Sequence, residues 1–152
     1  MLLSDLKHKY FSKVTSIASF GKYIFVGCES GLIRVINMES KPLEDSKPLI
    51  SATKNQPKSP VTTIDVSPGM LFLLSGHQNG MLVVWDMKKF KVLTIIKDDA
   101  IHDSEIRSAK FYSIQEENSI GIISVEAKGP VRKIEIDKNT SFLSLGSKSY
   151  SS

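Results

Sequence analysis

Short runs of β-branched and aromatic residues, separated by glycine, proline and asparagine, recur along this chain. Such runs are typical of β-strands. Helical periodicity is absent outside residues 3–10, so the pattern predicts an all-β fold. The expected strands fall into three successive groups of four: 14–18, 23–26, 32–36 and 49–50; then 61–66, 70–74, 81–85 and 91–96; then 106–111, 120–125, 131–136 and 142–143.

A fixed period relates the three groups. Gly31, Gly80 and Gly129 lie 49 residues apart, and the apolar positions Ile36, Trp85 and Ile134 keep the same step. Self-similarity at about 40–50 residues is typical of an array of repeated supersecondary units. The sequence therefore predicts three copies of one four-stranded antiparallel unit.

Each repeated glycine is expected in the turn between the second and third strands of its unit. Ser30-Gly31 and Asn79-Gly80 fit two-residue hairpin turns in which both central residues take positive φ. Lys128-Gly129 is followed by Pro130, which predicts an altered turn in the third unit.

The run 81–85 is apolar at every position and ends at Trp85-Asp86. A strand that does not alternate is expected to be buried on both faces, as in a sheet packed between two others. We therefore place the units at about 12–52, 60–97 and 104–145. Residues 39–60 are expected to form a basic, proline-containing loop, and residues 146–152 a flexible serine-rich tail.

Trp85-Asp86, preceded by Ser75-Gly76 and Asn79-Gly80, resembles the WD-repeat β-propeller family. His102, just before the third unit, resembles the histidine of the element that opens such repeats. The resemblance implies a partial propeller of about three blades, in which a His, a Ser, a turn Asp and the Trp form a hydrogen-bonded network.

Several residues depart from the family pattern. Asn79 occupies the turn Asp position, isoleucine replaces Trp at Ile36 and Ile134, and Pro57 stands where the second unit would have His. An incomplete polar network is therefore expected, with stability resting on apolar packing between sheets.

Residues 61–136 show a closer likeness to the propeller family of vacuolar protein sorting-associated protein 8, the CORVET-specific tethering subunit, carried by Gly80–Asp86, Lys91–Leu93 and the step from Asp99-Ala100 into Lys110-Phe111. The resemblance implies a non-enzymatic scaffold in endosomal vesicle tethering and vacuolar or lysosomal protein transport. Its implied partners are other tethering subunits and an early-endosomal Rab GTPase. Its implied location is the cytoplasm, peripheral to endosomal membranes through those partners. A sister subunit of the HOPS complex is an alternative.

Composition changes this picture little. The 152 residues are 41% apolar, which is normal for a globular chain, and the net charge of +4 is spread without a dense basic cluster. Nucleic acid is therefore not an expected partner, and a small nucleic-acid-binding β-domain is the least favoured alternative. A generic WD-repeat adaptor in signalling or RNA processing ranks above it. The single cysteine, Cys28, is expected to be a buried thiol.

Catalytic and cofactor motifs are weak. His8, His77 and His102 have no second ligand at metal spacing, so neither a metal nor another cofactor is expected. The acidic stretch 98–105 has no nucleophile beside it, and Gly146–Ser149 lacks the first glycine of a phosphate loop. The sequence predicts no enzyme.

Three units present a closure problem. Propellers usually close with four to eight blades. Three sheets cannot form a ring alone, so both end sheets are expected to expose apolar faces. The chain is accordingly expected to be a fragment, a truncated product, or one part of a propeller completed by another chain.

Overall fold

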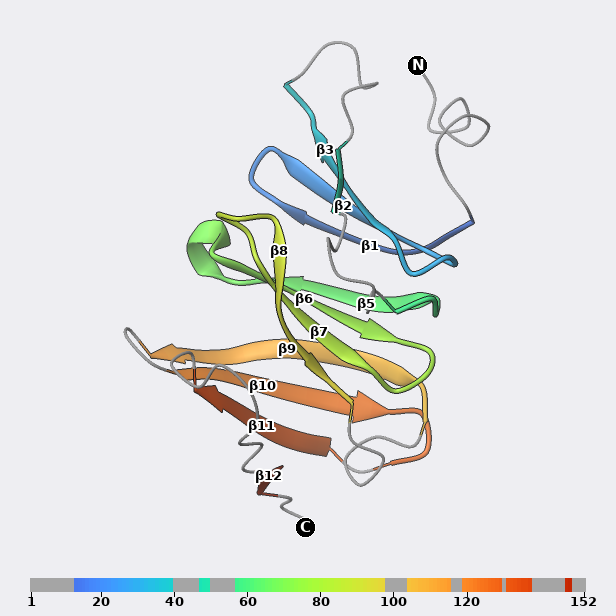
Figure 1. Ribbon diagram of the computed structural model, residues 1–152, viewed down its shortest axis with the longest axis vertical. Helices are drawn as coiled ribbons and strands as arrows, with labels where there is room; N and C mark the ends of the chain where they lie inside the picture. Colours follow the sequence, from blue (N-terminus) through green and yellow to red (C-terminus); the bar gives the residue numbers. More distant parts are fainter. Residues whose placement is uncertain are drawn as a thin grey trace.

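The computed structural model describes residues 13–39, 47–49, 57–97, 104–115, 119–129, 131–137 and 147–148. Within this part, three antiparallel sheets of four strands are stacked along the long axis of the molecule (Figure 1). The first sheet contains β1 (Val14–Phe20), β2 (Tyr23–Cys28), β3 (Ile33–Asn37) and β4 (Lys47–Leu49). The second contains β5 (Val61–Val66), β6 (Phe72–His77), β7 (Leu82–Asp86) and β8 (Lys91–Ile96). The third contains β9 (Ile106–Gln115), β10 (Ser119–Glu126), β11 (Val131–Asp137) and β12 (Ser147–Lys148).

The predicted all-β array of three four-stranded units is confirmed. The fourth strands differ most from expectation. β4 lies inside the segment expected as a loop, and β12 lies inside the expected tail, where Ser147 and Lys148 pair with β11. The open edges of β3 and β11 present backbone N–H and C=O groups, which attract a short pairing segment whatever its side chains. The expected strand at 142–143 lies outside the described residues.

β6 begins at Phe72 and not at 70, because the single 3-10 turn η3 (Pro68–Met70) precedes it. Proline suits the first position of such a turn. Gly69 and Met70 then both adopt positive φ, at 70° and 55°. The chain reversal therefore extends through Met70, the residue at which the sequence pattern began the strand.

The glycine turns are three-residue loops and not the two-residue hairpins with two positive φ angles that the sequence predicted. Gly31 N–H donates to the Cys28 carbonyl at 3.0 Å, and Gly80 N–H donates to the His77 carbonyl at 3.1 Å. Only the glycines have positive φ, 84° and 81°. This is the geometry of a type I turn followed by a left-handed glycine. The two turns repeat one structure at the predicted period.

Two apolar clusters hold the three sheets together. The first joins the first and second sheets, and the second joins the second and third. β7 contributes to both, since Val83 and Trp85 lie in the first cluster while Leu82 and Val84 lie in the second. All four side chains have no exposed surface. The predicted burial of this strand on both faces is confirmed.

Each first strand carries a β-bulge at the same place, at Thr15, Thr62 and Arg107. A bulge removes one residue from the ladder and redirects its side chain. The Thr15 hydroxyl donates to the Val61 carbonyl at 2.6 Å, and the Thr62 hydroxyl donates to the Ile106 carbonyl. The bulges therefore turn two threonines into links between neighbouring sheets.

Glycine lets neighbouring sheets approach closely at the same joints. A Cβ on Gly27 would lie 2.7 Å from Val61 Cγ1, and a Cβ on Gly76 would lie 2.6 Å from Ile106 Cγ2. Val61 and Ile106 are the first strand residues of the second and third sheets. Each thus packs into the space that a side chain on the glycine of the preceding sheet would fill. The period places Val125 at the corresponding position of the third sheet.

The outward face of the third sheet is more polar than the apolar end face that the sequence led us to expect. Lys133 stands at the repeat position of Val35 and Val84 and is exposed. The Tyr112 hydroxyl donates to Glu135 Oε1 at 2.8 Å, and Lys133 Nζ lies 4.9 Å from the centre of the Tyr112 ring. Polar contacts therefore cover the outward face of the third sheet, whereas the corresponding faces of the first and second sheets pack against the next sheet.

Candidate functional site: the repeat positions and the turn surface

A chain of hydrogen bonds crosses the interior of the second sheet. Trp85 Nε1 donates to Ser75 Oγ at 3.2 Å, and Ser75 Oγ lies 3.1 Å from His77 Nε2. His77 Nδ1 lies 3.0 Å from the Ser59 carbonyl oxygen. All three side chains are fully buried. These hydrogen bonds fix β6 and β7 to the segment that leads into β5.

The hydrogen-bond partners determine the protonation of His77. A carbonyl oxygen only accepts, so Nδ1 carries the proton and Nε2 accepts from the Ser75 hydroxyl. Burial lowers the pKa of His77, against the smaller opposing effect of the Ser59 carbonyl. The imidazole is therefore neutral, and each polar side-chain atom of Ser75, His77 and Trp85 has a hydrogen-bond partner.

The sequence pattern missed this network. Histidine was expected before the first strand of the unit, at the position of Pro57, whereas His77 reaches Ser75 from the end of β6 itself. The network contains the His, the Ser and the Trp of the family pattern but no turn Asp, so it is incomplete as expected, with His77 in place of the expected histidine. The repeat period would have been the signal, because it aligns His77 with Cys28 and Glu126, and both are buried.

The three sheets fill these repeat positions with different chemistry. The first uses Val26, Cys28 and Ile36, all buried. In the third sheet, the buried Glu126 accepts from the Ser104 hydroxyl at 3.0 Å and from Arg132 Nε at 3.2 Å. A buried carboxylate is tolerated when it is hydrogen-bonded and paired. One backbone scaffold thus accommodates an apolar, a neutral polar and an ionic interior.

Two of the other residues predicted at repeat positions lie in the core. Ile36 and Ile134 are buried, and Ile134 belongs to the second cluster. Gly129 is half-buried and its φ is not in the left-handed region, as the altered turn implied. His102 lies outside the described residues. Among the residues that the structure describes, no three His, Cys, Asp or Glu side chains are grouped to hold a metal ion.

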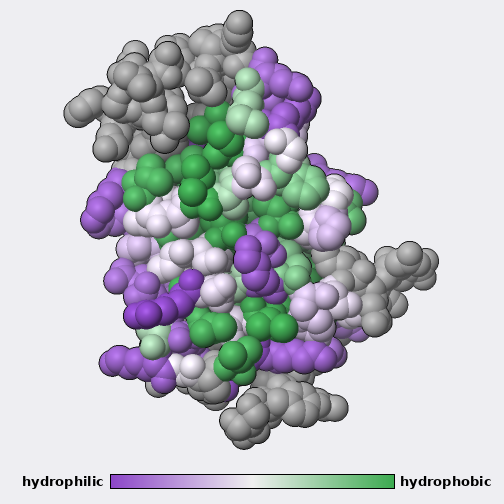
Figure 2. All heavy atoms as spheres, turned by 180° about the vertical axis from the view of Figure 1, so that it is seen from behind, coloured by the Kyte–Doolittle hydropathy of each residue, from purple (hydrophilic) through white to green (hydrophobic). Residues whose placement is uncertain are grey.

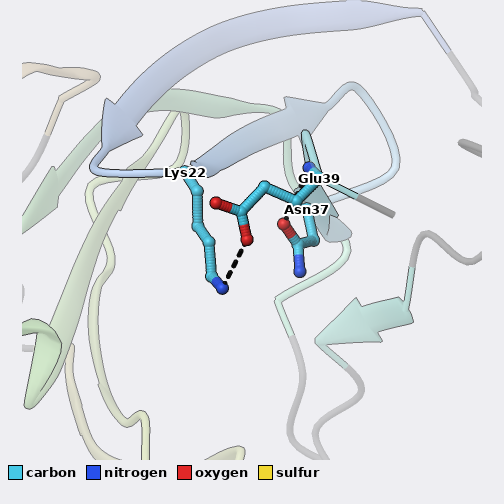
Figure 3. A network of polar contacts seen from close by, with 3 residues as sticks. All are labelled: Lys22, Asn37 and Glu39. Carbon is cyan, nitrogen blue, oxygen red and sulfur yellow. Dashed lines mark hydrogen bonds and ion pairs between the residues drawn. The ribbon is translucent and has the colours of Figure 1, made fainter. Parts of the chain in front are cut away.

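Asp86 organises a turn at the end of β7. Its Oδ1 accepts the backbone N–H groups of Lys88 and Lys89, at 2.9 and 3.0 Å. Asn37 does the same in the first sheet, where Oδ1 accepts the Glu39 N–H at 3.0 Å beside the 2.7 Å ion pair of Lys22 with Glu39 (Figure 3). Short polar side chains that accept from residues two positions on are typical of Asx turns.

The turns at this end of the first two sheets lie on the same side of the array (Figure 1), and we call their exposed surface the turn surface. Met38 N–H donates to the Lys22 carbonyl, and Met87 N–H donates to the Leu71 carbonyl, at 2.9 and 3.0 Å. Tyr23 and Met70 both pack against the first apolar cluster. The exposed members of the turn surface are Phe20, Gly21, Lys22, Met38, Glu39, Pro68, Gly69, Leu71, Lys88, Lys89, Phe90 and Lys91.

Apolar side chains also reach the surface elsewhere. Figure 2 shows hydrophobic residues along the middle of the face opposite to that of Figure 1, with hydrophilic residues toward both sides. Polar residues separate these hydrophobic groups, so they do not form one continuous patch in this view. The described residues contain no helix of the length and apolar character that crossing a membrane requires.

Solved structures with the same arrangement are WD-type propellers. The Myceliophteria thermophila Cps50 (Swd1) β-propeller domain matches with a TM-score of 0.68 at 13% identity, over 91% of this chain and 40% of that one. The RRP9 WD40 repeats match with a TM-score of 0.66 at 15% identity, over 83% and 36%. The designed Ika4 protein matches with a TM-score of 0.59 at 19% identity, over 85% and 69%. These likenesses establish the fold.

The first two of these structures are much longer than this chain, which spans 40% and 36% of their lengths. The family model of the Vps8 beta-propeller matches residues 1–151. The resemblance noted from the residues around Trp85 is therefore confirmed. Propeller scaffolds of this kind bind other proteins, and such a family implies a non-enzymatic role. The chain belongs to the Vps8 beta-propeller family.

Proposed function

We propose that this chain is the propeller part of a CORVET-type subunit and acts in endosomal vesicle tethering and vacuolar or lysosomal protein transport. The observation that carries the proposal is the family match over residues 1–151. The implied partners are other tethering subunits and an early-endosomal Rab GTPase, at the cytoplasmic side of endosomal membranes.

The physical basis is a rigid array that presents turns for binding. The two apolar clusters and the threonine links between sheets hold the three sheets in fixed relation. Loops on a rigid scaffold bind with little loss of conformational freedom. Such an array suits repeated, reversible protein contacts better than chemistry on a bound substrate.

A nucleotide-dependent pull-down tests the proposal. The immobilised chain is offered an early-endosomal Rab loaded with a GTP analogue or with GDP, and a Rab of another compartment serves as the control. Preferential capture of the GTP form of the early-endosomal Rab is expected. Equal capture of both nucleotide forms, or of both Rabs, would contradict tethering and favour a generic WD-repeat adaptor.

The variant Trp85→Ala provides a structural control. Trp85 anchors the second sheet, so its loss should disorder the array and abolish nucleotide-dependent capture. Capture that survives this change would mean that binding does not depend on the folded array.

A further inference from the structure

The turn between β7 and β8 carries the densest basic and aromatic cluster of the turn surface. Three lysines flank one aromatic residue in the order Lys88, Lys89, Phe90 and Lys91, and all four are exposed. Phe90 leaves 49% of its surface in solvent although it is a large apolar residue. Exposure of this kind has a cost in water that burial in an apolar environment would remove.

The backbone at Phe90 is also unusual. Its φ is 51°, in the left-handed region that bulky residues rarely occupy. A glycine would adopt this angle without strain. Strained non-glycine residues gather at functional sites, where the surrounding structure maintains them. Phe90 thus combines two features that are unfavourable for a large apolar residue, a left-handed backbone and exposure to solvent.

Apolar residues of the neighbouring turns extend the same surface. Phe20, Met38 and Leu71 are exposed at the same end of the first two sheets. The charged residues beside them are the four lysines of the turn surface and two carboxylates. Lys22 forms an ion pair with Glu39, and Lys89 Nζ lies 3.9 Å from the Asp86 carboxylate. The turn surface is therefore apolar at its tips and carries a net charge of +2.

The opposite end of the sheets has a different character. The exposed residues of its described turns are polar: Glu29, Ser30, Lys58, Gln78, Asn79 and Lys128. Two valines at the starts of strands, Val14 and Val131, are also exposed at that end, so it is the combination of an aromatic residue with lysines that distinguishes the turn surface.

We propose that the turn surface binds directly to a lipid bilayer that carries anionic headgroups. The lysines contact the headgroups and Phe90 inserts at the level of the interface, where amphipathic and aromatic side chains are stable. The lysines on both sides of Phe90 complement anionic headgroups in charge, and the exposed apolar side chains complement the acyl boundary beneath them. The sequence alone suggested membrane association only through partners.

Vesicle sedimentation tests the lipid contact without any protein partner. The chain should sediment with vesicles of phosphatidylcholine and phosphatidylserine, and much less with phosphatidylcholine alone. High salt should weaken the binding, because the screening length falls from about 10 Å at 0.1 M to about 3 Å at 1 M. Failure of the wild-type chain to sediment with the anionic vesicles overturns the proposal.

The variant Phe90→Gly separates binding from folding. Because glycine relieves the strained φ, the melting temperature should stay close to that of the wild-type chain. Vesicle partitioning should fall about five- to tenfold with the loss of the aromatic side chain. Unchanged partitioning of this variant overturns the proposal.

A pair of double variants separates the turn surface from net charge. Lys88→Ser with Lys89→Ser should reduce partitioning about thirtyfold, since each basic residue near an anionic surface contributes about a factor of five. Lys58→Ser with Lys128→Ser removes the same charge at the opposite end and should have little effect. Equal losses in the two variants would overturn the assignment to the turn surface.

A protein partner at the same residues would give another result. Binding of a soluble peptide rich in glutamate and phenylalanine, lost in Phe90→Gly and unaccompanied by vesicle binding, overturns the lipid assignment in favour of an acidic protein segment. The vesicle assay contains no Rab, so its failure leaves the nucleotide-dependent pull-down as an independent test of the proposed tethering function.

Discussion

The Thr15 hydroxyl donates a 2.6 Å hydrogen bond to the Val61 carbonyl, from the bulge of one sheet to the first residue of the next. Thr15→Val keeps the shape of the side chain and removes the donor. We expect a loss of about 1 kcal/mol in the free energy of unfolding, because the Val61 carbonyl loses a bond across the joint. Urea unfolding monitored by the fluorescence of Trp85, the only tryptophan, measures it.

The adjacent residue supplies the matched control. The buried hydroxyl of Ser16 has no hydrogen-bond partner among the described residues. Ser16→Ala removes a polar group that burial disfavours, so the free energy of unfolding should stay within about 0.5 kcal/mol of wild type or rise. A loss as large as that of Thr15→Val would show that any change in this strand is costly and that the threonine link is not special.

Trp85→Ala should lower the free energy of unfolding by about 3–5 kcal/mol, since it leaves a cavity in the first cluster. Ser75→Ala removes the group that links the indole to the imidazole and should cost about 1–3 kcal/mol. Thermal melts by circular dichroism check both. A change below about 0.5 kcal/mol for Trp85→Ala would contradict the buried position of the strand.

Stability should fall in mild acid because His77 is held neutral. Burial lowers its pKa in the folded state, so the unfolded chain takes up a proton first as the pH falls. The contribution of His77 is complete above its ordinary pKa of about 6.5 and is lost below that value, by at most about 1.4 kcal/mol per pH unit. Unfolding between pH 5 and 8 measures this dependence, which should shrink in His77→Gln. An unchanged pH dependence in the variant would assign it to other groups.

Two glycines with positive φ should respond differently to alanine. Gly31 and Gly21 have φ of 84° and 56°. A Cβ on Gly31 would lie 2.0 Å from the Pro57 carbonyl oxygen, whereas a Cβ on Gly21 has no neighbour within 4 Å. Gly21→Ala should cost about 1 kcal/mol from backbone strain, and Gly31→Ala clearly more. Equal melting temperatures for the two variants would contradict the close approach at Gly31.

The regular features of the fold follow from local patterns in the sequence. The strands 61–66 and 91–96 were predicted with the bounds that the structure shows, since runs of β-branched residues define them. The apolar run ending at Trp85 predicted burial on both faces because no position in it is polar. The 49-residue period predicted the number of sheets.

Features set by tertiary contacts were not predictable in the same way. β4 and β12 form because a neighbouring strand edge is open, and their own residues are poor strand formers. The role of His77 depends on the approach of Ser59, which lies 18 residues earlier in the chain. The threonine links require bulges, which leave no mark in the hydrophobic pattern.

The central claim is that the three sheets support one another through interlocked joints, and Ile106→Ala tests it most directly. Ile106 belongs to the third sheet and to the second cluster, where it lies close to Gly76, while Trp85 lies in the second sheet and in the first cluster, at the other joint. We predict one cooperative unfolding transition in Trp85 fluorescence, with the free energy of unfolding lowered by about 2–5 kcal/mol. An unchanged Trp85 transition would show that the sheets fold independently and would contradict the account.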